Sequence, residues 1–280
     1  MDASNLTFDS NIIRSLYTYI VEDLADPRAK NLPLLHNPMW VVSSIVIYLI
    51  LVLNIVPKWM VDKKPFKLYH LILVYDAIEI IGSGIAIYLF FKHGWRWSYF
   101  HECKTPDFSD DPNSLGFLRA AYFTYLLKLS ELIETVMYAL RKKNNQISAF
   151  HVYHHCYALV TSWGFAKYGG GSMLSYTIIV NSIVHVGMYT YYLLSIYAQK
   201  LPFSLIPLKK LVTVLQIFQL ITVLGNLANA MKSTCTVPIL HCLYHGPNMA
   251  LQIKLFLDFY NSAYRSKPND SMNKNHQKTQ

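Results

Sequence analysis

Residues 38–56 read PMWVVSSIVIYLILVLNIV, a run without a single charged side chain. A helix of this length rises about 28 Å, close to the ~30 Å hydrocarbon core of a bilayer. Comparable apolar stretches recur at residues 68–91, 115–140, 148–167, 173–197, 208–230 and 237–262. The sequence therefore predicts an all-α membrane protein with seven transmembrane helices.

The composition agrees with a membrane protein. The chain has 280 residues, of which 53% are hydrophobic and only 15% are charged, whereas a soluble domain has about 25% charged residues. The net charge of +9 comes from short basic clusters between the spans, without interleaved aromatic residues. We therefore expect no nucleic acid as a partner, and the lipid bilayer is the expected partner of the apolar spans. The first 37 residues do not read as a cleavable signal and predict only a short amphipathic helix, with Ile12, Ile13, Leu16 and Ile20 on its apolar face.

Basic residues gather on alternate loops and so predict the orientation of the chain. They are Lys58, Lys63, Lys64 and Lys67; Arg141, Lys142 and Lys143; Lys200, Lys209 and Lys210; and Arg265, Lys267, Lys274 and Lys278. By the positive-inside rule these loops are cytosolic, which places the N-terminus in the lumen and the C-terminus in the cytosol. We expect a luminal segment at 1–37, a seven-helix catalytic domain at 38–262 and a disordered tail at 263–280.

The cysteines fit this orientation. None of the four forms a C-x-x-C pair, so no zinc site is expected. Cys103 and Cys235 both fall in luminal loops, where the compartment is oxidising, and are predicted to form a disulfide bond. Asn5 begins the sequon Asn5-Leu6-Thr7 in the luminal tail and is a candidate glycosylation site.

Three histidines stand at the start of the fourth span, in His151-Val152-Tyr153-His154-His155. On a helix, His151, His154 and His155 fall within an arc of roughly 100°. Ionisable groups inside a span are functional by default. The pattern leaves three alternatives: ligands of iron, a metal-free set of acid, base and nucleophile, or unrelated core histidines.

The third span carries a polar stripe of Lys128, Glu131, Glu134 and Thr135, which covers an arc of about 120° on a helix. Lys128 and Glu131 have the spacing of an ion pair, and Glu134 then needs a partner among the histidines of the next span. An unpaired charge at this depth costs several kcal/mol. The stripe either supports a site or only holds helices together.

Polar residues in the fifth and sixth spans lie at a similar depth. Asn181, His185, Tyr189 and Tyr192 belong to the fifth span, and Gln216 and Gln219 to the sixth; the two glutamines could also be interhelical contacts alone. Together these groups predict a polar chamber near the cytosolic side, with an apolar interior beyond. A coenzyme A thioester, with a charged head and a long hydrocarbon tail, fits such a chamber, and the basic loops could meet its phosphates.

Four motifs, in order and at matching separations, resemble the very-long-chain fatty acid elongases of the endoplasmic reticulum. They are K-x-x-E-x-x-[DE]-T at Lys128–Thr135, H-x-x-H-H at His151–His155, H-x-x-M-Y-x-Y-Y at His185–Tyr192 and T-x-x-Q-x-x-Q at Thr213–Gln219. Leu140-Arg141-Lys142-Lys143 also matches, whereas Glu134 stands in place of the family aspartate.

The resemblance implies a fold in which six of the seven helices form a barrel around a closed substrate tunnel. It also implies condensation of a long-chain acyl-CoA with malonyl-CoA, which gives 3-oxoacyl-CoA, CO2 and CoA, with no bound cofactor or metal. Separate reductases and a dehydratase of the elongation cycle would take the product onward. The resemblance does not decide between a monomer and a homo-oligomer.

For the mechanism, we expect His154 to attack the thioester and form an acyl-imidazole; its choice among the box histidines rests on the resemblance. His185, with Asn181, would position the enolate of malonyl-CoA. His151 and His155 would act as acid–base or orienting partners held by Lys128, Glu131 and Glu134. Supporting or substrate-binding roles are expected for Arg141, Lys142, Lys143, Tyr189, Tyr192, Gln216 and Gln219.

Three alternatives compete with this interpretation. Soluble condensing enzymes use cysteine, and Cys156 directly follows the box, although on a helix it points about 140° away from His154. A membrane di-iron desaturase or hydroxylase would need further histidine clusters, and the remaining histidines are scattered. A seven-helix receptor or transporter would not require four polar stripes at one depth.

Overall fold

The computed structural model describes residues 10–232, 235, 237 and 239–265. These residues form helices and connecting loops, and no β-strand occurs among them. The prediction of an all-α protein is therefore confirmed. Asn5 and residues 266–280 lie outside the described residues, so the glycosylation site and the character of the tail stay predictions.

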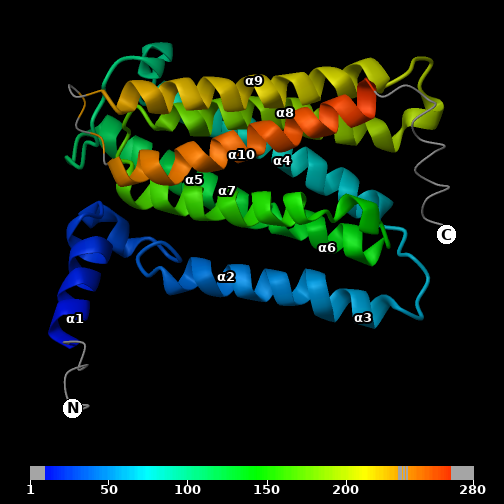
Figure 1. The fold of residues 1–280 in the computed structure, drawn as a ribbon, viewed down its shortest axis with the longest axis horizontal. Helices are drawn as coiled ribbons and strands as arrows, with labels where there is room; N and C mark the ends of the chain where they lie inside the picture. The colour runs from blue at the N-terminus through cyan, green and yellow to red at the C-terminus, as the bar shows by residue number, and fades with distance from the viewer. Residues whose placement is uncertain (1–9, 233–234, 236, 238, 266–280) are drawn as a thin grey trace, which may run out of the picture.

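The long helices follow the predicted apolar segments to within a few residues, and Figure 1 shows them side by side along the longest axis of the molecule. They are α2 (Met39–Ile50), continued by the π-helix η3 (Leu51–Ile55) and α3 (Val56–Met60), α4 (Tyr69–Lys92), α5 (Pro112–Ser130) with α6 (Leu132–Leu140), α7 (Ala149–Tyr168), α8 (Ser175–Ile196), α9 (Ile206–Ala230) and α10 (Ile239–Tyr264).

Four of these helical stretches are long and apolar enough to cross a membrane: Met39–Met60, α4, α8 and α9. The other three are more polar inside the helix: α5–α6 contains the Lys128 stripe, α7 contains the histidine box, and α10 contains His245 and Gln252. Several spans in one chain make this a multi-pass membrane protein.

The first long helix shows how one residue sets local geometry. Pro57 has no amide hydrogen and its ring obstructs the preceding turn. Directly before it, the helix widens into the π-turn η3, where the amide of Val56 donates to the carbonyl of Leu51. A π-bulge of this kind keeps the helix continuous past the proline.

Six of the helical stretches form a closed circuit. Helix α4 packs against α5 and α8, α8 against α9, α9 against α10, and α5 against α7. The circuit closes between α7 and α10 through side chains, since Tyr153 contacts Asn248 and His154 contacts Gln252. The α2–α3 stretch lies outside the circuit, against α6 and α7 (Figure 1).

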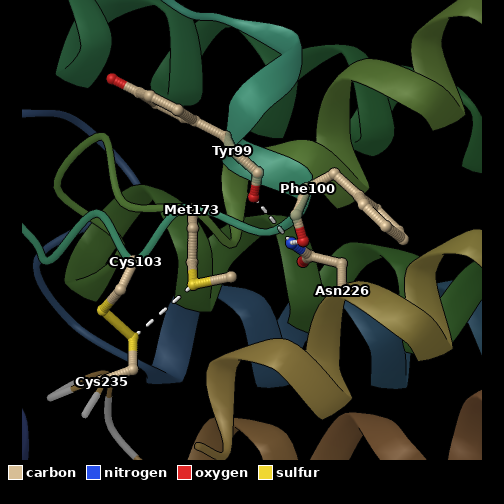
Figure 2. Close-up of a disulfide and its surroundings, with 6 residues drawn as sticks. All are labelled: Tyr99, Phe100, Cys103, Met173, Asn226 and Cys235. Atoms are coloured by element: carbon tan, nitrogen blue, oxygen red, sulfur yellow. Dashed lines mark hydrogen bonds between the residues drawn. A yellow bond between two sulfur atoms is a disulfide. The ribbon is translucent and has the colours of Figure 1, made fainter.

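Loops at one end of the bundle are tied together by covalent and hydrogen bonds. Cys103, which follows η4 (Trp97–Phe100), is joined to Cys235 between α9 and α10 by a disulfide bond, with Cα atoms 5.6 Å apart (Figure 2). The side-chain amide of Asn226 donates to the carbonyls of Tyr99 and Phe100, at 2.9 and 3.2 Å. The two cysteines expected to pair are thus bonded, and they fix the 92–113 loop to the start of α10.

The N-terminal segment contains the short amphipathic helix that was expected. Helix α1 (Ser10–Thr18) presents Ile12, Ile13 and Leu16 as exposed side chains, and Figure 1 shows it set across the direction of the long helices. The remaining short elements are η1 (Tyr19–Asp23), η2 (Pro27–Asn31), η5 (Asn144–Gln146) and η6 (Ala198–Lys200).

Candidate active site

The histidine box occupies the first turns of α7, where a side-chain cap fixes the start of the helix. The hydroxyl of Ser148 accepts a hydrogen bond from the amide of His151 at 3.1 Å, which satisfies one of the free amides of the first turn. From this start, the rings of His151 and His155 lie 4.4 Å apart, and those of His154 and His155 lie 6.1 Å apart. The local sequence therefore brings the three imidazoles together.

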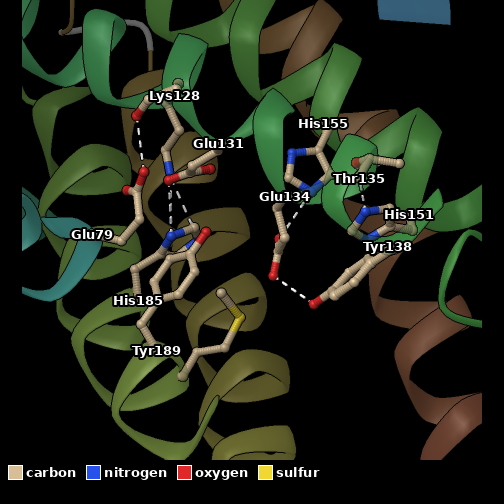
Figure 3. Close-up of polar contacts among 12 residues, drawn as sticks. Glu79, Lys128, Glu131, Glu134, Thr135, Tyr138, His151, His155, His185 and Tyr189 are labelled. Carbon is tan, nitrogen blue, oxygen red and sulfur yellow. Dashed lines mark hydrogen bonds and ion pairs between the residues drawn. The ribbon is translucent and has the colours of Figure 1, made fainter. Parts of the chain in front are cut away.

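Lys128 and Glu131 form a buried ion pair that also holds His185. The ammonium of Lys128 donates to Glu131 Oε1 at 2.7 Å and lies 3.3 and 3.4 Å from the two ring nitrogens of His185. Glu131 Oε1 lies 3.1 Å from His185 Nδ1. Figure 3 shows these three side chains together, with Glu79 beside them. Oε1 of Glu79 accepts a 2.8 Å hydrogen bond from the hydroxyl of Ser130. His185 is thus held by a cation and an anion that also pair with each other.

Glu134 contacts the box itself. Its Oε2 lies 3.6 Å from His155 Nε2, and its Oε1 accepts a 2.6 Å hydrogen bond from the hydroxyl of Tyr138 (Figure 3). The expectation that Glu134 finds a histidine partner in the next long helix is therefore confirmed. The carboxylate of Glu134 thus has one partner on α7 and a second in Tyr138 on its own helix.

His151 is held by a hydroxyl. The Oγ1 atom of Thr135 lies 2.9 Å from His151 Nε2 and 2.9 Å from the hydroxyl of Tyr48 on α2. The helix outside the circuit thus supports the box through a chain of two hydroxyl groups. Tyr48 and Tyr138 were not singled out from the sequence, and nothing distinguishes them there from the other tyrosines of the chain.

The polar stripe is therefore divided between two groups of histidines. We expected Lys128, Glu131 and Glu134 together to hold His151 and His155. That was wrong for Lys128 and Glu131, which contact His185 instead. The two carboxylates lie one helical turn apart along the stripe, so Glu131 reaches His185 of α8 whereas Glu134 reaches His155 of α7.

His154 has a partner that the sequence analysis missed. Its Nδ1 atom lies 3.0 Å from Oε1 of Gln252, which comes from α10. Gln252 is 1% exposed. The only sequence signal was a strongly polar side chain within the last apolar segment, at no fixed distance from any motif.

These groups surround a cavity of about 330 Å³. Its lining includes His151, His154, His155 and His185, together with Glu131, Glu134, Asn181, Tyr189, Tyr192, Gln216, Gln219 and Gln252. The cavity extends to Gln146, Ser148 and Lys209 near the predicted cytosolic ends of the helices, and Val184 and Leu220 add apolar wall. The structure thus brings together residues of all four motifs.

Three sets of predicted site residues lie outside this lining. Lys128 contacts Glu131 and His185, which belong to the lining, but is not itself part of it. Arg141, Lys142 and Lys143 follow α6, and the ammonium of Lys142 donates to the carbonyl of Val61. Cys156 is half-buried and packs with the apolar core rather than the cavity. Lys209 is the basic side chain that the cavity reaches.

One subset of the site has the geometry of a cation site. Possible ligand atoms of Glu134, His151 and His155 all lie within 4.8 Å of one another. Two imidazoles and one carboxylate are a donor set that zinc or iron accepts. Two of these three residues already have hydrogen-bond partners, His151 in Thr135 and Glu134 in Tyr138, and one such set is not a two-iron centre. Hydrogen-bonded acid–base chemistry is the simpler use of this arrangement.

Comparison with known proteins gives one consistent result. The family described as ELO (GNS1/SUR4) matches residues 33–272. Very long chain fatty acid elongase 4 of Homo sapiens is 30% identical over 245 residues, which cover 86% of this chain and 76% of the relative. Very long chain fatty acid elongase 7 of Drosophila melanogaster is 28% identical over 88% of this chain and 74% of the relative.

Another relative, very long chain fatty acid elongase 1 of Mus musculus, is 37% identical over 171 residues, a stretch that spans 61% of either chain. The family match covers all four motifs and all the residues that line the cavity. The chain therefore belongs to the ELO (GNS1/SUR4) family and is a very long chain fatty acid elongase, a 3-oxoacyl-CoA synthase of the multi-pass membrane type.

Proposed function

We propose that this enzyme joins a long-chain acyl-CoA to malonyl-CoA through an acyl intermediate on His154. The observation that carries the proposal is the single cavity lined by His151, His154, His155 and His185. A condensing enzyme must hold an acyl group and the enolate derived from malonyl-CoA in one place. Because the cavity offers the box histidines for the first and His185 for the second, a two-step reaction is favoured.

In the first step, Nε2 of neutral His154 attacks the thioester carbon of acyl-CoA. The carbon–sulfur bond breaks, CoA leaves as a thiolate that takes a proton from water, and the acyl group is bonded to a positively charged imidazole. The neighbouring His151 and His155 are oriented by Thr135 and Glu134. They act as general acid or base for proton transfer near the leaving CoA.

In the second step, malonyl-CoA loses CO2 and the resulting enolate carbon attacks the acyl carbon. The bond to His154 breaks, and the electron pair returns to Nε2, so the enzyme is regenerated with 3-oxoacyl-CoA as product. His185 and Asn181 line the same cavity and are placed to position the enolate oxygen. The Lys128 ammonium beside His185 adds a fixed positive charge where negative charge develops.

We also propose that all seven helical stretches cross the endoplasmic reticulum membrane, with residues 38–262 as the catalytic domain, the N-terminus luminal and the C-terminus cytosolic. Six of them would surround a tunnel that receives the acyl chain, and the helix circuit closed between α7 and α10 supports this arrangement. The position of Lys209 at the cavity supports entry of CoA from the cytosolic side. Reductases and a dehydratase in the same membrane would take up the product.

A trapping experiment tests the covalent step. Purified enzyme given acyl-CoA alone should release CoA and gain the mass of the acyl group on a peptide that contains His154. His154→Ala should give neither product. Absence of the adduct on the wild-type enzyme in a single turnover would end the covalent proposal while leaving the family assignment intact.

Cysteine catalysis is tested by the same assay. Because Cys156 packs outside the cavity lining, Cys156→Ser should form the adduct at a rate within about twofold of the wild-type rate, as expected of a substitution that touches no reacting group. Loss of all acyl transfer in this variant would make Cys156 the nucleophile.

A further inference from the structure

Among the described residues of α10, Gln252 is the one with a polar contact to a histidine of the box. Its Oε1 lies 3.0 Å from His154 Nδ1, and its side chain lines the cavity. The other two box histidines have partners on α6, namely Thr135 and Glu134. The proposed nucleophile is thus held by a different helix from the one that holds its neighbours.

We infer that Gln252 is a positioning residue that fixes the reactive tautomer of His154. A neutral imidazole carries its proton on one nitrogen and a lone pair on the other. A carbonyl oxygen only accepts hydrogen bonds, so the nitrogen that faces it must carry the proton. With Gln252 Oε1 at Nδ1, the lone pair is left on Nε2, the atom that attacks the thioester.

The same contact is useful after the attack. Acylation of Nε2 leaves the ring positively charged with its proton still on Nδ1, and a hydrogen bond from a charged donor is about twice as strong as a neutral one. The acceptor therefore binds the developing charge more tightly than the ground state, which is the condition for lowering a barrier. The amide nitrogen of Gln252 has no hydrogen-bond partner among the described residues, so the contact of its oxygen with His154 is the hydrogen bond that holds this side chain there.

The contact between Tyr153 and Asn248, one helical turn away between the same two helices, offers a matched control. Tyr153 on α7 contacts the side-chain oxygen of Asn248 on α10, and neither residue belongs to the cavity lining. Asn248→Leu removes a hydrogen bond between the same two helices without touching a box histidine. It therefore reports how much the packing of α10 alone contributes.

The inference rests on the proposed acyl-histidine, and the experiment separates the two. Single-turnover formation of the acyl adduct is measured for the wild type, Gln252→Met, Gln252→Glu and Asn248→Leu, together with acyl-CoA affinity. Gln252→Met keeps the length of the side chain and loses the acceptor, so acylation should slow by about 10- to 100-fold with affinity changed less than about twofold. Gln252→Glu retains an oxygen at this place and should stay within about tenfold of the wild type, while Asn248→Leu should stay within about twofold.

Each outcome decides the matter. Acylation by Gln252→Met at the wild-type rate would overturn the inference, as would an equal loss in Gln252→Met and Asn248→Leu, since the effect would then be packing. Loss in Gln252→Glu as complete as in Gln252→Met would mean that the amide nitrogen, not the oxygen, matters. A wild-type enzyme without any adduct would instead overturn the proposed function.

Discussion

Lys128 and Glu131 are both buried, with 7% and 2% exposure, and together they hold His185. A buried ion pair stabilises a protein little, because the loss of hydration offsets the attraction, but removal of one partner leaves an unpaired charge. The pair is therefore better explained by what it does to His185 than by stability. A histidine held by a cation and an anion at once has a defined orientation toward the cavity.

This explanation separates stability from activity in two variants. Glu131→Leu leaves the Lys128 ammonium without its carboxylate and should destabilise the enzyme by about 3–5 kcal/mol. The double variant Lys128→Met with Glu131→Leu removes both charges and should recover most of that loss. Both variants should lack condensation activity, because His185 loses one charged partner in the single variant and both in the double variant. Thermal unfolding in detergent and a malonyl-CoA condensation assay measure the two properties.

The comparison is informative in either direction. If Glu131→Leu unfolds at the same temperature as the double variant, the Lys128 charge finds another partner in the fold. If the double variant condenses at the wild-type rate, the pair does not orient a functional His185.

At the scale of the helices, the two ends of the bundle are built differently. The end near Cys103 is closed by the disulfide bond and by Asn226, which holds the carbonyls of Tyr99 and Phe100 (Figure 2). The opposite end carries the lining residues Gln146 and Lys209 of the cavity. The closed end suits the hydrocarbon chain of an acyl-CoA, and the end with Lys209 suits its large polar CoA head.

The disulfide bond should contribute measurably to stability. It joins residues that are 132 positions apart, and a cross-link over so long a loop restricts the unfolded chain by about 2–4 kcal/mol. Cys103→Ser, Cys235→Ser and the double variant should therefore unfold at the same lowered temperature, since each loses the same bond. Cys156→Ser, which removes a free cysteine, is the control and should unfold near the wild-type temperature. Additive losses in the double variant would mean that the cysteines stabilise the fold separately.

At the scale of the whole molecule, features set by a single helix were predicted from the sequence, whereas only some contacts between helices were, such as that of Glu134 with a box histidine. Apolar length located the helices, and i to i+3 spacing predicted the Lys128–Glu131 pair, because both depend on the geometry of one helix. The contact of His154 with Gln252 depends on α7 lying beside α10, and on how each helix is rotated. Sequence spacing carries no information on either, which is why Gln252 and Tyr48 were missed while the box itself was found.

The orientation of the whole molecule in the membrane is the broadest proposal, and two loops test it. Lys64 lies in the basic 61–68 loop between α3 and α4, and Asp110 lies just before α5; both side chains are exposed. If the basic loops face the cytosol, Lys64→Cys should react with a membrane-impermeant maleimide in sealed microsomes, whereas Asp110→Cys should react only after detergent. The wild type is the background, because its free cysteines are buried or half-buried. Labelling of Asp110→Cys in sealed microsomes, with Lys64→Cys labelled only after detergent, would contradict this orientation. It would place the disulfide end in the cytosol, where such bonds do not persist, and the end of the cavity with Lys209 in the lumen.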